Sequence, residues 1–119
     1  MSSDIWHLKR IEEQLQREIA WTISNKVNDP RIPSVTTVTT IKLAPDTRHA
    51  TIFVSIYGDV EQKTKAIKAL NRAAPFIQRC VSSRVSIKHF PKFLFKIDNF
   101  FEKSNQINSL LAQVKDDLL

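Results

Sequence analysis

This sequence predicts a single α+β domain in which helices cover one face of a small β-sheet. Two changes of period predict it: helical spacing of apolar residues gives way to alternation after Ser34, and helical spacing returns after Asp59. At 119 residues the chain, 1–119, has the length of one domain and shows no internal repeat. We therefore expect the order α-β-β-α-kink-α-β-α, folded as a two-layer sandwich whose second sheet face is open.

Residues 4–27 are predicted to form the first helix. Their apolar residues recur every three or four positions as one stripe: Leu8, Ile11, Leu15, Ile19, Ile23 and Val27. Pro30 disfavours helical dihedrals at the residue before it, so Asn28-Asp29-Pro30 ends this helix. An irregular loop over 28–34 is expected to follow.

Residues 35–57 are predicted to form a β-hairpin. β-branched side chains alternate in both halves, with Ile41 and Leu43 on one face and Val38 and Lys42 on the other. A short turn that contains proline separates the two halves, so we expect antiparallel pairing.

Residues 60–85 are predicted to form two helices joined by a kink. Asp59 and Gln62 have the spacing of a capping box, which starts the first of these helices. The proline of Ala73-Ala74-Pro75 removes a backbone amide from the helical ladder, so the axis must kink or restart there. Proline is tolerated as the first residue of a new helix.

Residues 93–97 alternate as a third strand, and residues 105–118 carry the last helical stripe. The apolar positions of that final helix are Ile107, Leu110, Leu111, Val114 and Leu118.

The positive charge of the chain is confined to one stretch. Residues 60–103 hold ten Lys and Arg against three Asp and Glu, whereas the rest of the chain sums to −1 of the net +6. A localised polyanion-binding surface requires such a concentration, and solubility alone does not.

Several kinds of chemistry are excluded or disfavoured. Gly58 is the only glycine, so no phosphate loop, dinucleotide fingerprint or GxxG clamp is present. His7, His49 and His89 lack the spacing of metal ligands, and no nucleophile motif accompanies the serines. We expect no catalytic residue, no metal and no cofactor.

Cys80 is the only cysteine, which rules out an internal disulfide and a paired-cysteine zinc site. It is expected with Phe76 on the buried face of its helix. The N-terminus lacks the charge and apolar run of a signal peptide, and no stretch is apolar enough to span a bilayer. A cytoplasmic monomer without membrane contact is expected.

The chain resembles the bacterial ribosome-binding factor A family from about Leu8 to Leu118. The segments that carry the resemblance are Arg10-Ile11, Gln14 to Ile19, Asn28-Asp29-Pro30-Arg31, Asp46 with Ala50 to Ser55, Lys68-Ala69-Leu70, Ala73-Ala74, Phe76-Ile77, Ile87-Lys88, Pro91, Phe95 and Asp98. Two positions depart from the family pattern. Pro75 stands where glycine is usual, and Gln78 stands where arginine is common, with Arg79 displaced by one position.

The resemblance implies a type II KH-like fold in which a small-residue kink replaces the GxxG loop. It also implies a cytoplasmic, non-enzymatic assembly factor that binds the immature small ribosomal subunit and its ribosomal RNA. Such a factor assists late maturation of the RNA end and matters for growth in the cold.

The residues favour an RNA-binding surface along the kinked helices and the strand after them. Its candidate cations are Arg72, Arg79, Arg84, Lys88, Lys92 and Lys96. The last three alternate along an extended segment and are the preferred contacts. The alternative is that all six are ordinary solvated faces.

Phe90, Phe93 and Phe95 allow two interpretations, either stacking of bases on an open sheet or packing in the core. Core packing is favoured because Phe93 and Phe95 share a face with Ile97.

Two other functions compete with RNA binding. A basic protein-interaction module that binds an acidic partner without RNA, or one that meets an anionic lipid surface, would also use cationic helices. A small RNA hydrolase is disfavoured because no clustered acid, base or metal set is present.

Overall fold

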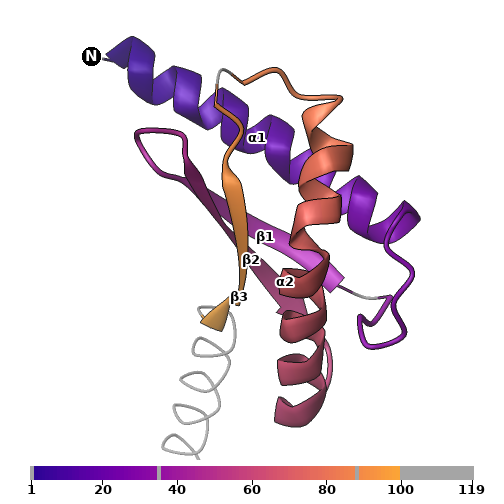
Figure 1. The fold of residues 1–119 in the computed structure, drawn as a ribbon. Helices are drawn as coiled ribbons and strands as arrows, with labels where there is room; N and C mark the ends of the chain where they lie inside the picture. The colour runs from indigo at the N-terminus through magenta and orange to yellow at the C-terminus, as the bar shows by residue number, and fades with distance from the viewer. Residues whose placement is uncertain (1, 35, 88, 100–119) are drawn as a thin grey trace, which may run out of the picture.

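The computed structural model describes residues 2–34, 36–87 and 89–99, and the helix predicted over 105–118 lies outside these ranges. The described elements, in chain order, are α1 (Ser2–Asn25), β1 (Thr36–Leu43), β2 (His49–Ile56), α2 (Val60–Ser82) and β3 (Lys92–Ile97) (Figure 1).

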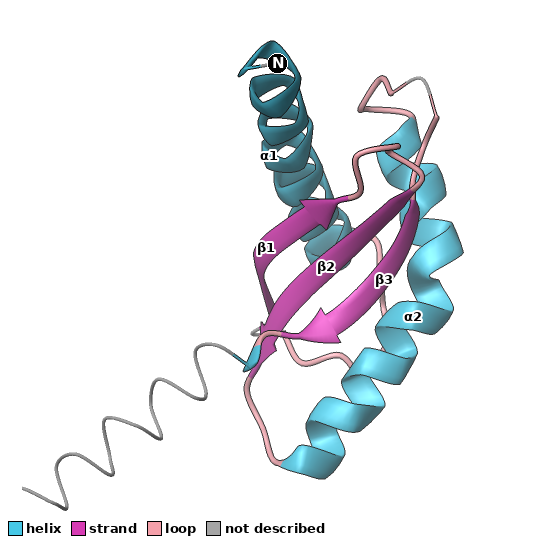
Figure 2. Cartoon of the chain, turned by 90° about the vertical axis from the view of Figure 1, so that its left-hand side faces the viewer, coloured by secondary structure: helices cyan, strands magenta, loops and turns pink. Residues whose placement is uncertain are grey.

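The sheet has the order β1-β2-β3, so β1 and β3 are its two edge strands. β1 pairs antiparallel with β2 through the hairpin, and β3 pairs parallel with β2 after the α2 crossover. Figure 2 shows the three strands in front and both helices behind them. The predicted α+β class is confirmed, and the described helices cover one face of the sheet.

The core lies between that face and the two helices. Leu15 and Ile19 of α1, Ile52 of β2, and Leu70 and Ile77 of α2 are each 0% exposed. Burying a side chain of this size contributes about 1.5–3 kcal/mol, so these contacts hold the two layers together.

A β-bulge in β1 corrects the predicted alternation. The register shifts between Val38, which pairs with Val54, and Thr40, which pairs with Phe53. Val38 is therefore buried on the same side as Ile41, and not beside Lys42 as the regular period predicts. One extra residue in a strand turns every side chain beyond it to the other face.

α2 is one helix that runs through Pro75 and ends at Ser82. The prediction of a separate third helix from 75 to 85 is wrong. Core contacts hold the parts of α2 before and after Pro75 in one helix, because Ala74 and Ile77 flank the proline and both are buried. Figure 2 shows the axis of α2 curving along its length, as an internal proline promotes.

The start of α2 matches the predicted capping box. The Asp59 carboxylate accepts from the Gln62 backbone N–H, and the Gln62 side chain accepts from the Asp59 N–H, both at 2.8 Å. Gly58 precedes the cap at φ +148°, where a Cβ would lie 2.6 Å from the Gln62 side-chain oxygen. Glycine is needed here for both space and conformation.

The outer edge of β3 is closed by two amide side chains of α2. Asn71 accepts from the Phe95 N–H at 2.8 Å and donates to the Phe95 carbonyl at 3.1 Å. About two turns further along α2, the Gln78 side chain accepts from the Phe93 N–H at 3.1 Å. These side chains replace the missing neighbour strand, since unpaired edge groups otherwise recruit other chains.

The outer edge of β1 has a similar partner on α1. The Gln16 amide donates to the Val38 carbonyl at 3.1 Å, where the bulge interrupts the ladder. Each edge strand of the sheet is thus hydrogen-bonded by an amide of the helix that lies along it.

We predict that Asn71→Ala destabilises the protein by about 2–3 kcal/mol, because it leaves a backbone donor and acceptor of Phe95 without partners. Urea denaturation followed by circular dichroism measures this. Gln14→Ala, on the exposed side of α1, is the control and is expected to stay within about 0.5 kcal/mol. Equal stability of the two variants would show that the amide does not close the edge.

Candidate nucleic-acid interface

The candidate cations fall into three places on the molecule. Arg72 and Arg79 lie on α2, Arg84 follows α2, and Lys92 and Lys96 lie on β3, whereas Lys88 is outside the described residues. The structure therefore separates residues that the sequence predicts as one surface.

An exposed row of cations runs along the side of α2 that faces away from the sheet. We call it the α2 stripe, and its members are Lys65, Lys68, Arg72, Phe76 and Arg79. Steps of three and four residues place all five on one side of the helix. All are exposed, and within the described residues Glu61 forms an ion pair with Lys65 of the stripe at 3.3 Å.

Phe76 belongs to this stripe and not to the core. It is 40% exposed, so the prediction that it lies on the buried face is wrong. The small Ala74 takes the inward position and is 5% exposed, while Pro75 is exposed beside Phe76. Of the predicted kink residues, Ala73 and Ala74 therefore lie toward the core, and Pro75 lies on the exposed side next to the α2 stripe.

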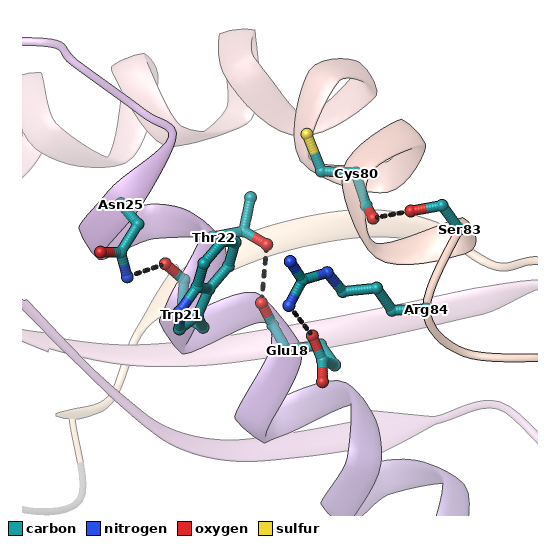
Figure 3. A network of polar contacts seen from close by, with 7 residues as sticks. All are labelled: Glu18, Trp21, Thr22, Asn25, Cys80, Ser83 and Arg84. Atoms are coloured by element: carbon teal, nitrogen blue, oxygen red, sulfur yellow. Dashed lines mark hydrogen bonds and ion pairs between the residues drawn. The ribbon is translucent and has the colours of Figure 1, made fainter.

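Arg84 is held by α1. Its guanidinium lies 4.0 Å from the centroid of the Trp21 ring, and its Nη1 lies 3.4 Å from a carboxylate oxygen of Glu18 (Figure 3). Thr22, on the same turn of α1, donates to the Glu18 carbonyl at 2.7 Å. A cation over an indole ring is stabilising, so these contacts join the end of α2 to α1. Contact of Arg84 with RNA stays a prediction.

The loop after α1 forms a local ion pair near the α2 stripe. Arg31 donates to the Asp29 carboxylate from its side chain at 2.6 and 2.9 Å and from its backbone N–H at 2.9 Å. These hydrogen bonds, with smaller contributions from the charges of Arg31 and Arg72, lower the pKa of Asp29 from its ordinary 3.8 to about 2.

The face of the sheet that the described helices leave uncovered carries the second group of cations. Lys92 and Lys96 of β3 are exposed there, as is Lys42 of β1. Leu94, between the two β3 lysines, is 47% exposed. Phe53 lies on the central strand of this face, because its neighbours Ile52 and Val54 are buried on the other.

Sequence reasoning missed Phe53, although its place opposite the buried side chains of β2 was a usable signal. The core interpretation of Phe93 and Phe95 is confirmed, since Phe95 is 1% exposed and Phe93 is 7% exposed. The ring of Phe90, half-buried against the core, lies 5.6 Å from that of Phe93.

In the part of the chain that the structure describes, no group of three or more His, Cys, Asp or Glu is placed to hold a metal ion. Neither described helix combines the length and apolar composition that crossing a bilayer requires.

The sequence matches the model of the family described as ribosome-binding factor A over residues 7–111. One relative is the ribosome-binding factor A of Clostridium novyi, which is 36% identical over 111 residues, covering 93% of this chain and 92% of that protein.

Two solved structures are similar in fold. The crystal structure of ribosome-binding factor A from Thermus thermophilus has a TM-score of 0.67 at 27% identity, covering 76% of this chain and 94% of that one. A homology model of the Thermus thermophilus factor, fitted into a cryo-electron microscopy map of a 30S–RbfA complex, has a TM-score of 0.62 at 26% identity and covers 75% and 92% of the two chains.

We predict that Arg31→Ala raises the pKa of Asp29 from about 2 towards 3.8, because the carboxylate loses the side-chain hydrogen bonds and the charge of Arg31 and keeps only the bond from the backbone N–H. Since the folded pKa is depressed, the stabilising effect of the ion pair is present above pH 3.8 and is lost as the pH falls through 2. An NMR titration of the side-chain carboxyl measures the shift.

Arg72→Ala is expected to raise the same pKa by less, since Arg72 acts only through its charge, and the distant Arg10→Ala is the control. A pKa that stays near 2 in Arg31→Ala would contradict this assignment.

Proposed function

The chain belongs to the ribosome-binding factor A family, and we propose that it is a ribosome assembly factor that binds the immature small ribosomal subunit. The match over most of both chains supports the proposal. So does the likeness to the Thermus thermophilus factor that was fitted into a map of a 30S complex.

The proposal includes contact with the ribosomal RNA of that subunit, help in late maturation and processing of the RNA end, and a role in growth in the cold. The protein acts as a cytoplasmic monomer by binding and performs no reaction. These properties are implied by the family resemblance, and each is open to direct test.

The fold is proposed to be of the type II KH-like kind. The order α-β-β-α-β and the parallel pairing of β3 with β2 support it. In this interpretation the segment Ala73-Ala74-Pro75 takes the place of the GxxG loop, and α2 continues through it as a curved helix.

The α2 stripe is proposed as the main RNA contact. Its four cations cover 15 residues, or about 21 Å of helix axis at 1.5 Å per residue. Arginines contact phosphate oxygens through a rigid fork of donors, so Arg72 and Arg79 are proposed as its principal phosphate ligands. Lys92 and Lys96 on β3 remain proposed contacts, as does Lys88, which lies outside the described residues.

Exposed cations along one helix give affinity without reading the base sequence. Selectivity for the small subunit must then come from the shape of the folded RNA that the curved helix fits. The single observation that supports RNA contact at this surface is that all five residues of the α2 stripe are exposed.

We predict that the double variant Arg72→Gln, Arg79→Gln weakens binding to immature small subunits by about tenfold or more, because two charge-assisted contacts are removed. Cosedimentation at several salt concentrations measures it. The slope of log affinity against log salt should fall by about 2, since each lost phosphate contact reduces it by about 0.9.

The matched control is Arg10→Gln, Arg17→Gln, which removes two exposed arginines at the same spacing of seven from α1. Equal loss in both double variants would show only a general effect of net charge. If the protein failed to cosediment and instead bound an acidic protein of the subunit without RNA, the proposed RNA contact would be wrong.

A further inference from the structure

The uncovered sheet face has an aromatic ring at its centre and cations around it. Phe53 on β2 pairs with Thr40 on β1 and with Lys96 on β3, so its nearest cross-strand neighbours are a hydroxyl and an ammonium group. In the next row, Thr51 pairs with Lys42 and with Leu94. Residues in such rows lie about 5 Å apart, within side-chain contact.

This ring lines a shallow hollow in the surface. The residues around the hollow are Thr40, Lys42, Phe53, Ile97, Asp98 and Asn99. No described helix lies over this face (Figure 2). An aromatic ring that forms the wall of an open hollow is placed to receive a flat apolar group.

The charges around the hollow favour an anionic ligand. Lys42 and Lys96 are exposed on the two strands that flank Phe53, and Lys92 is exposed further along β3. The acidic group at the hollow is Asp98, whose carboxylate accepts from the Thr39 hydroxyl at 2.6 Å. The lysines outnumber this carboxylate, so the electrostatic potential over the Phe53 ring is positive.

We propose that this sheet face binds unpaired RNA, with one base stacked on Phe53 and the adjoining phosphates held by Lys42 and Lys96. The inference deepens the proposed function, on which it rests, by adding a second RNA surface and naming its ligand. Aromatic rings stack on any base and basic side chains follow the backbone, which is how single strands are bound without strict sequence preference.

Paired RNA does not fit this site. The bases of a duplex are stacked on one another and cannot reach a half-buried ring on a sheet, whereas an unpaired base can be splayed out onto it. The exposed Thr40 hydroxyl beside Phe53 can donate to or accept from a base edge or a 2′-hydroxyl. In this proposal the two surfaces bind different forms of RNA: the α2 stripe binds folded RNA, and the sheet face binds a single strand.

The test compares binding of a fluorescently labelled uridine hexamer and of a paired RNA hairpin to the full chain by anisotropy. Phe53→Leu keeps an apolar side chain but removes the ring, so we expect hexamer affinity to fall about fivefold to tenfold, the loss of one stacked base. Hairpin affinity should change by less than twofold. Phe53→Trp, which restores a ring, should recover hexamer binding.

Salt dependence separates the aromatic contact from the ionic ones. Phe53→Leu should leave the slope of log affinity against log salt unchanged, whereas Lys42→Gln and Lys96→Gln should each reduce it by about 0.7, the value for one single-strand phosphate. Phe76→Leu on the α2 stripe is the matched control and should leave hexamer affinity unchanged.

The inference is overturned if Phe53→Leu binds the hexamer as tightly as the unaltered protein, or if Phe76→Leu weakens it equally. It is also overturned if Phe53→Trp fails to recover binding while the fold is retained. Cosedimentation with small subunits that persists alongside any of these results would leave the proposed function standing, so the two failures are distinguishable.

Discussion

The two open edges of a three-stranded sheet are the constraint on which this molecule depends. Each edge strand presents backbone groups that a neighbouring strand would satisfy, and here side-chain amides satisfy them instead. Asn71 and Gln78 bond β3, and Gln16 bonds β1. A helix that supplies such an amide must lie along the edge on the core side, so both described helices cover one face and leave the other uncovered.

The same amides fix how α2 is turned. Asn71 and Gln78 face β3, and each is followed by an arginine, Arg72 or Arg79, rotated by about 100° around the axis. That rotation carries both arginines away from the strand into the exposed α2 stripe. Gln78 uses its side chain to bond the strand, and the exposed cation Arg79 follows it one position later.

The sequence predicted the parts of the fold that local period and capping determine. The stripe of α1, the hairpin and the Asp59 capping box all follow from residue spacing. The bulge was not predictable, because a run of threonines gives no sign of which one is the extra residue. The path of α2 through Pro75 depends on core contacts at Ala74 and Ile77, which residue spacing alone does not weigh against the lost amide.

The candidate site was predictable only in part, because spacing along the chain does not show which elements meet. Arg84 was grouped with the helix cations, yet its partner Trp21 comes from a helix 63 residues earlier. Phe53 lies outside the basic stretch, whereas Phe93 and Phe95 within it belong to the core. The two proposed RNA contacts, the α2 stripe and the uncovered sheet face, lie on different sides of one small domain.

Directed hydroxyl-radical cleavage of ribosomal RNA tests this account most directly. In a Cys80→Ala background, one new cysteine is introduced in each of three variants and carries a tethered iron chelate. The variants are Phe76→Cys on the α2 stripe, Thr51→Cys on the sheet face and Gln14→Cys on α1. Each labelled variant is then bound to immature small subunits. We predict strong cuts near the first two tethers, at different RNA positions, and weak cuts from the third. Cleavage confined to the α1 tether would contradict the central claim.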